Sequence, residues 1–246
     1  MAVLICVLMA IGIMTATGPK NASAAQTRDT VVMLHGIGHS RWNMYWVERA
    51  MRKEGYATVN ITYPSLKQDI SALAGFIHER LAEEKIWTRA GRVHFVTHSM
   101  GGLVARRYLA EHKSDIPLEK MGRVVMIAPP NGGSEVADFL KNFPPYRWGF
   151  GPAGQQLTTK ARSADVATPW YETGIIAGTR GWPYIVAGLL IDGDHDGRVC
   201  VEKTKLKGMK DHITFAATHS FISWKRGVHG QITHFLKDGV FDHDKP

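Results

Sequence analysis

One serine, with a threonine two positions before it and a glycine two positions after it, has the surroundings of a nucleophile. Ser99 follows the apolar run VHFVTH at 93–98 and lies within THSMGG at 97–102. The residues after it are apolar at helical spacing, so the serine is expected at a sharp turn between a strand and a helix. Such a turn lifts a hydroxyl above the edge of a sheet and presents it to a substrate.

The usual pattern of this turn is G-x-S-x-G, because little space is left two residues before and after the serine. Gly101 fits that pattern and Thr97 departs from it. Threonine is β-branched and compatible with a strand end, so we expect a tolerated variant. A serine that only caps a helix is the alternative interpretation, and downstream residues decide between the two.

A serine nucleophile needs a histidine base and a carboxylate that orients it. When the serine comes first in the chain, the carboxylate and then the histidine follow it. The sequence DGDHDGRV at 192–199 supplies three aspartates. Asp196 is the predicted carboxylate because a glycine and an apolar segment follow it at a tight turn. Asp194 is the second candidate and Asp192 the third, and each is otherwise a turn residue or a solvated charge.

The predicted base is His219, which follows a β-rich run and precedes a helix. His212 comes before that strand, at the wrong edge of a parallel sheet. His229 and His234 fall within the last helix, where packing or solvation explains them. His98 is adjacent to Ser99 but is expected to point elsewhere from the turn.

Backbone amides are expected to stabilise a negatively charged oxygen of the reacting group. One is the amide of Met100, directly after the serine, and the other is that of Ile37 in the sequence HGIG at 35–38. His35 is in addition a candidate for contact with the substrate. The alternative is that the glycines of this segment only make a tight turn.

These segments, together with APPNGGS at 128–134, resemble α/β-hydrolases of the lipase and esterase type, in particular small bacterial lipases. The similarity spans about residues 30–240. It implies a serine hydrolase that cleaves carboxylic esters through a Ser-His-Asp triad, without a metal or an organic cofactor. Acyl transfer and the hydrolysis of thioesters or amides use the same triad and remain alternatives. A binding protein that has kept the fold without turnover is a further alternative.

Strand and helix patterns alternate along the chain and predict an α/β fold, a mostly parallel sheet with helices on both faces. Strands are expected at 30–34, 57–62, 92–96, 123–128, 175–177, 184–187 and 213–217, and helices at 41–54, 68–85, 100–112 and 228–236. Residues 131–173 interrupt the alternation and predict a small insertion over the site, within a single domain at 25–246. Its Phe143, Tyr146 and Trp148 are predicted to line an apolar substrate pocket or a lipid-facing flap. Ordinary packing onto the sheet is the alternative.

The net charge of +8 comes from scattered lysines and arginines, the densest group being four lysines at 203–210. We therefore expect no nucleic-acid partner, a small-molecule or lipid ester as substrate, and transient contact with lipid surfaces. The apolar residues 2–14 and an A-x-A site ending at 24 predict a secretory signal at 1–24, and hence export to the bacterial periplasm or medium. Cys200 then remains as a buried packing residue.

The acidic loop at 192–197 also copies the first half of an EF-hand. Lys203 stands at the twelfth position, where a calcium loop needs a glutamate. No metal site is therefore predicted, although Ca²⁺ bound by Asp192 or Asp194 is a looser alternative.

Overall fold

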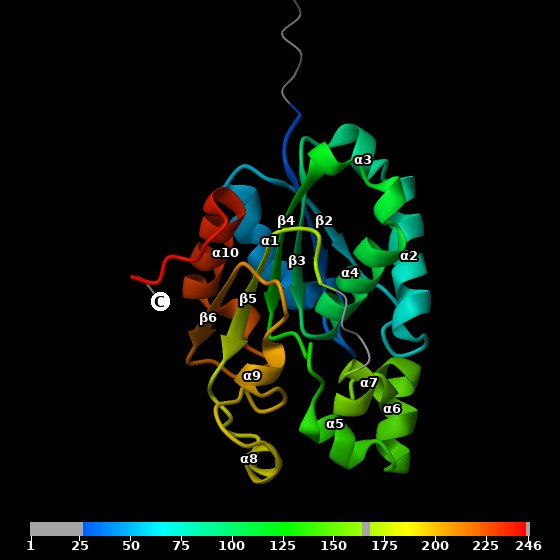
Figure 1. Cartoon of the computed structure of the whole chain (residues 1–246), viewed down its shortest axis with the longest axis vertical. Helices are drawn as coiled ribbons and strands as arrows, with labels where there is room; N and C mark the ends of the chain where they lie inside the picture. Colours follow the sequence, from blue (N-terminus) through cyan, green and yellow to red (C-terminus); the bar gives the residue numbers. More distant parts are fainter. Residues whose placement is uncertain (1–26, 164–167, 245–246) are drawn as a thin grey trace, which may run out of the picture.

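The structure, a computed structural model, describes residues 27–163 and 168–244, and the predicted signal at 1–24 lies outside them. A parallel six-stranded sheet of order β2-β1-β3-β4-β5-β6 forms the centre (Figure 1). The strands are β1 (Thr30–Leu34), β2 (Ala57–Ile61), β3 (Val93–His98), β4 (Met121–Ile127), β5 (Thr173–Gly178) and β6 (Asp211–Phe215). The predicted α/β fold with a mostly parallel sheet is confirmed.

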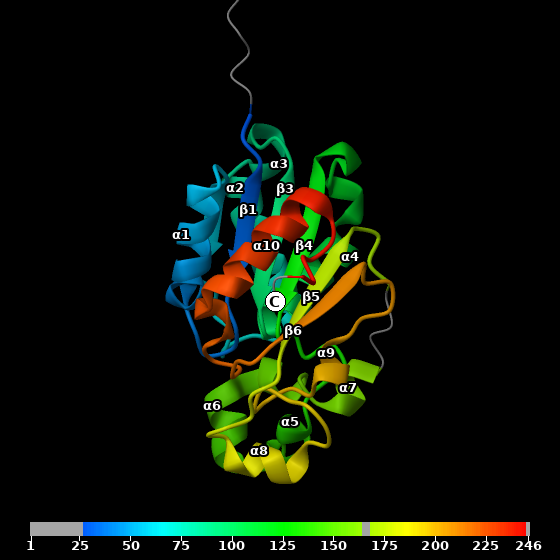
Figure 2. The same ribbon diagram turned by 90° about the vertical axis from the view of Figure 1, so that its left-hand side faces the viewer.

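Helices cover both faces of this sheet, as Figures 1 and 2 show. One face carries α2 (Ile70–Glu83), α3 (Ile86–Arg89) and α4 (Met100–Glu111), and the other carries α1 (Tyr45–Lys53) and α10 (Arg226–Asp238). Strands β1, β3 and β5 are buried at every position, as expected for parallel strands that helices cover on both faces. Short 3-10 helices are η1 (Arg41–Met44), η2 (Lys113–Asp115), η3 (Leu118–Lys120) and η4 (Ile222–Trp224).

A group of short helices lies at the carboxyl ends of the strands, in the lower part of both views. They are α5 (Glu135–Leu140), α6 (Pro144–Gln155), α7 (Thr159–Ser163), α8 (Ile185–Leu190) and α9 (Val201–Thr204). We call α5, α6, α7 and α8 the cap. Among the helices in the described part of the chain, none is both long and apolar enough to span a membrane.

The expected strand at 184–187 is wrong, because the chain forms helix α8 there. A short apolar run has no periodicity that separates a strand from a buried helix. Tertiary packing decides: Ala187 contacts Ile191 and Cys200 in a small apolar cluster instead of joining the sheet. The cap therefore comes from two separate segments, and Cys200 is a buried, free cysteine as predicted.

Three histidines in and beside the sheet are completely buried. Burial lowers the pKa of His35 and of His94 to about 4, and it holds the pKa of His98 well below its ordinary value. His94 Nδ1 accepts a hydrogen bond from the Arg123 amide at 3.0 Å, which requires this nitrogen to be unprotonated. The folded protein therefore holds these imidazoles in the neutral form.

We expect the protein to lose stability in mild acid. An unfolded histidine takes up a proton near its ordinary pKa of 6.5, before the buried ones do. The buried neutral histidines therefore contribute fully to the free energy of unfolding above that pH. This contribution is lost as the pH falls towards 4, by about 1 kcal/mol per pH unit for each histidine. Urea unfolding at several pH values measures this, and His94→Gln should show a shallower slope than the wild-type chain. Identical slopes would contradict the role of His94.

Candidate active site

Ser99, His219 and Asp196 come together at the carboxyl ends of the strands. His219 Nε2 lies 2.9 Å from Ser99 Oγ, and His219 Nδ1 lies 2.7 Å from Asp196 Oδ2. All three side chains are buried. The structure thus joins the three predicted residues, which come from three different loops, in one chain of hydrogen bonds.

The Asp196 carboxylate is held in a fixed orientation. Its Oδ1 accepts hydrogen bonds from the amides of Arg198 at 3.0 Å and Val199 at 2.9 Å, which leaves Oδ2 for His219. The amide of His219 also donates to the carbonyl of Asp196 at 2.9 Å. Because a carboxylate only accepts, His219 carries its proton on Nδ1, and Nε2 is free to accept the hydroxyl proton of Ser99.

The other two aspartates of this loop are placed differently. Asp192 and Asp194 are exposed, whereas Asp196 is completely buried with both oxygens bonded inside the protein. The loop therefore does not offer the three carboxylates to one cation, as an EF-hand would. His212 lies at the start of β6 and contacts Thr204, away from the serine.

The turn at Ser99 is strained and tightly packed. The serine has φ 53° and ψ −127°, a conformation that favours glycine. A Cβ at Gly101 would lie 2.5 Å from the carbonyl oxygen of Leu34, so only glycine fits there. At Gly102 a Cβ would lie 3.3 Å from Oγ1 of Thr97. Gly102 thus leaves room for the β-branched Thr97, which explains how the departure from the usual pattern is accommodated.

Two amides beside Ser99 are available to a ligand. Met100 is the first residue of α4, where the amide has no partner within the helix. Within the described residues, neither the amide of Met100 nor that of Ile37 donates a hydrogen bond. The loop of Ile37 lies against the serine, because a Cβ at Gly36 would approach Ser99 Cβ to 3.2 Å. The predicted donors are therefore close to the hydroxyl and unengaged.

His35 does not contact the substrate pocket, and the prediction that it would is wrong. Its ring is completely buried and stacks on Tyr63 with 4.1 Å between the ring centres. The Tyr63 hydroxyl donates to the His35 carbonyl, and the Gly38 amide donates to Ser65 Oγ at 3.0 Å. These contacts hold the loop of Ile37 in place, so His35 is a packing residue of this loop.

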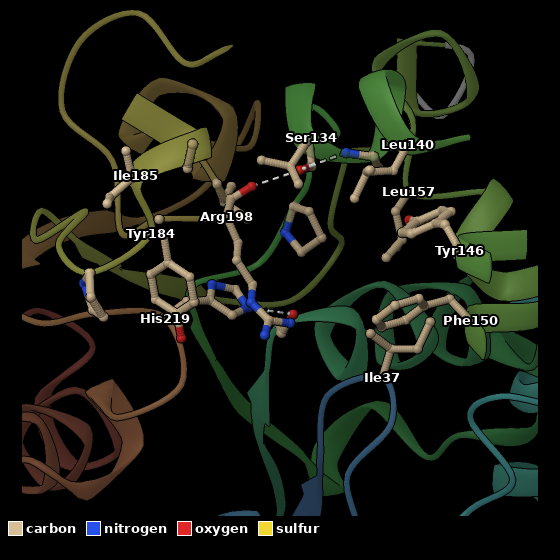
Figure 3. Close-up of a pocket in the computed structure, with 18 residues that line it drawn as sticks. Ile37, Ser134, Leu140, Tyr146, Phe150, Leu157, Tyr184, Ile185, Arg198 and His219 are labelled. Carbon is tan, nitrogen blue, oxygen red and sulfur yellow. Dashed lines mark hydrogen bonds between the residues drawn. The ribbon is translucent and has the colours of Figure 1, made fainter. Parts of the chain in front are cut away.

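A cavity of about 600 Å³ opens above Ser99 and His219 (Figure 3). Figure 3 shows two facing walls. One wall is apolar and is formed by Ile37, Leu140, Tyr146, Phe150 and Leu157. The other consists of Tyr184, Ile185 and Arg198, beside His219. The lining is thus largely apolar on both sides, and Arg198 adds a cation on the side of His219.

Only one of the three aromatic residues predicted for the pocket lines it. Tyr146 does, but Phe143 and Trp148 are 55% and 93% exposed and point away. In a helix, residues two positions apart face opposite sides, so Tyr146 and Trp148 cannot both face the cavity. Phe150 lies four positions after Tyr146 and shares its face, a spacing that could have identified it from the sequence.

His98 takes part in the site in a way that the sequence did not reveal. It points away from the Ser99 hydroxyl as predicted, but its Nε2 donates to the carbonyl of His219 at 2.9 Å. Burial and the neighbouring His219 hold the pKa of His98 well below its ordinary value. A neutral His98 therefore fixes the backbone of His219, as a positioning residue.

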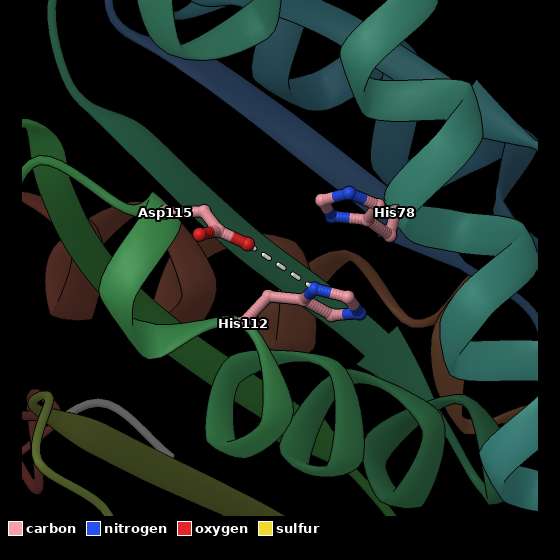
Figure 4. A group of neighbouring side chains, drawn as sticks. All are labelled: His78, His112 and Asp115. Atoms are coloured by element: carbon pink, nitrogen blue, oxygen red, sulfur yellow. Dashed lines mark hydrogen bonds and ion pairs between the residues drawn. The ribbon is translucent and has the colours of Figure 1, made fainter.

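A second group of side chains lies between α2 and the end of α4 (Figure 4). The rings of His78 and His112 stack with 3.8 Å between centres and 10° between planes, and Asp115 lies 3.3 Å from His112 Nδ1. A metal ion must lie near the plane of each imidazole that binds it. Two parallel rings do not aim their nitrogens at one point, so this arrangement suits helix packing better than metal binding.

The sequence was also compared with models of known protein families. Residues 31–220 match the alpha/beta hydrolase family, and the chain therefore belongs to that family.

Solved structures with a similar fold include a lipase, a carboxyl esterase and a thioesterase. The mature Bacillus licheniformis lipase BlEst2 is 18% identical with a TM-score of 0.68, over 89% of this chain and 95% of that one. The metagenomic carboxyl esterase MGS0156 is 16% identical with a TM-score of 0.60, over 85% and 70%. The type II thioesterase YbtT of the yersiniabactin pathway is 15% identical with a TM-score of 0.58, over 87% and 94%. At these identities the likeness is one of fold.

Proposed function

We propose that this hydrolase cleaves carboxylic esters through Ser99, His219 and Asp196. The observation that carries the proposal is the continuous hydrogen-bond chain from Asp196 to Ser99 at the base of a largely apolar cavity. A serine that only caps a helix would need neither the histidine nor the strained backbone.

The reaction follows from the placement of these groups. Ser99 Oγ attacks the ester carbonyl carbon while His219 Nε2 accepts the hydroxyl proton. The amides of Ile37 and Met100 donate to the oxyanion that forms. The tetrahedral intermediate expels the alcohol, which takes the proton from His219 and leaves an acyl group on Ser99. Water, deprotonated by His219, then attacks this acyl-enzyme and releases the acid.

The apolar wall favours an acyl chain of modest length. Leu140, Phe150 and Leu157 line it, and the volume of the cavity is about 600 Å³. Exposed apolar side chains of the cap, Phe139, Trp148 and Leu189, would meet a lipid surface near the cavity. Together with the net charge of +8, they support transient contact with anionic lipid, and the predicted signal at 1–24 supports an exported protein.

The test is hydrolysis of p-nitrophenyl esters from acetate to palmitate, combined with labelling by a p-nitrophenyl organophosphate. We expect turnover that is highest at short to medium chains, and one phosphoryl adduct on Ser99 in the digested protein. Parallel assays with acyl thioesters and anilides compare other acyl substrates. A folded protein that neither turns over these substrates nor reacts with the organophosphate would refute a serine hydrolase.

A further inference from the structure

The cavity contains a cation that the proposed chemistry does not use. Arg198 lines the cavity with Ser99 and His219, and it has no ion pair within the described residues. The sequence holds 30 lysines and arginines, and a general positive surface could be supplied from outside the cavity. The position of Arg198 inside the cavity therefore needs a specific reason.

The structure holds Arg198 firmly in this wall. Its amide donates to Asp196 Oδ1 at 3.0 Å, and its carbonyl accepts from Ser134 Oγ at 2.6 Å. The guanidinium carbon lies 5.7 Å from the centre of the Tyr184 ring, within the range of a cation–π contact. Figure 3 shows the side chain extending from this anchored backbone towards His219. The guanidinium, a group with five N–H donors, therefore lies in the wall of the cavity that a substrate must enter.

Arg198 and His219 line the same cavity, and His219 becomes positively charged when it accepts the proton of Ser99. Two cations in one cavity repel each other. The positive charge of Arg198 already contributes, after burial, to the lowered pKa of the adjacent His39. A bound anion would remove this penalty and would let binding energy stabilise the transition state.

The two walls of the cavity also separate the two halves of an ester. His219 delivers its proton to the leaving alcohol, so the alcohol lies on the His219 side. Arg198 and Tyr184 belong to that side, whereas Leu140, Tyr146 and Phe150 form the opposite, apolar wall. The acyl chain and the alcohol thus meet different surroundings.

We propose that Arg198 binds an anionic group, a phosphate or a carboxylate, on the alcohol half of the ester. The proposal rests on the proposed function, because it assigns the substrate class of the same site. A guanidinium binds either anion through two parallel N–H donors, so the chemistry is shared. The resulting substrate has an apolar acyl chain and a negatively charged alcohol.

The test compares three soluble hexanoyl esters that differ only in the alcohol: hexanoylglycerol, hexanoylglycerol phosphate and the hexanoyl ester of glyceric acid. The measured quantity is the ratio of kcat/KM for each anionic ester to that for the neutral ester. We expect the wild-type ratio to exceed one and to fall about 10- to 100-fold in Arg198→Met and in Arg198→Gln. The phosphate and carboxylate arms show which anion is preferred.

A matched control is Arg147→Met, which removes the same charge from an exposed position on α6 outside the cavity. Its ratio should equal that of the wild-type protein. Equal ratios for Arg198→Met, Arg198→Gln and the control, or no preference in the wild-type protein, would overturn the proposal. Loss of the proposed function is distinguishable, because then all three esters and the organophosphate would fail to react.

Discussion

Replacing Ser99 by alanine is expected to abolish ester hydrolysis while the protein stays folded. The substitution removes the oxygen that forms the acyl-enzyme and leaves His219 and Asp196 in place. We expect kcat to fall about 10⁴- to 10⁶-fold, as removal of a triad nucleophile does elsewhere. Hydrolysis of p-nitrophenyl butyrate measures the loss, and thermal unfolding verifies the fold.

Glycine at the same position is a second variant that separates chemistry from strain. Ser99→Gly also lacks the nucleophile, so its activity should be as low as that of Ser99→Ala. Its stability should differ, because glycine adopts φ 53° and ψ −127° without the steric cost that serine and alanine incur. We expect Ser99→Gly to exceed Ser99→Ala by about 1 kcal/mol in free energy of unfolding. A Ser99→Ala protein that retains its turnover would refute the assignment.

The sequence identified those parts of the site that depend on local chemistry and chain order. A serine after a strand, an aspartate at a turn and a histidine before a helix each have a short-range signature. The parallel sheet then brings the carboxyl ends of its strands to one edge, so these residues were predictable as a group. The structure places Ser99, Asp196 and His219 within hydrogen-bond distance of each other.

The features that the sequence did not reveal depend on contacts between distant segments. Helix α8 packs Ala187 and Leu190 near Cys200 rather than in the sheet. Trp148 appeared suited to a pocket by composition, but the direction of α6 turns it to solvent. Arg198 is one basic residue among many until the cap encloses it beside His219. The amino-acid composition does not distinguish a pocket residue from a surface residue of the same type. Only their positions in the folded chain do.

Replacing Asp196 by asparagine is expected to lower kcat about 10³- to 10⁴-fold at neutral pH. The amides of Arg198 and Val199 both donate to Oδ1, so the asparagine carbonyl oxygen must occupy that position. Its NH₂ group then faces His219 Nδ1 and donates to it. The ring proton moves to Nε2, which can no longer accept the proton of Ser99.

The matched control for this variant is Asp194→Asn, the same chemical change at an exposed position of the same loop. It should retain kcat within about twofold, since surface substitutions of this kind disturb little. The ¹⁵N chemical shifts of the His219 ring report the tautomer directly and should invert only in Asp196→Asn. If both variants lost activity equally while the tautomer stayed unchanged, orientation of His219 by Asp196 would be refuted. The loop as a whole, rather than one buried carboxylate, would then determine the rate.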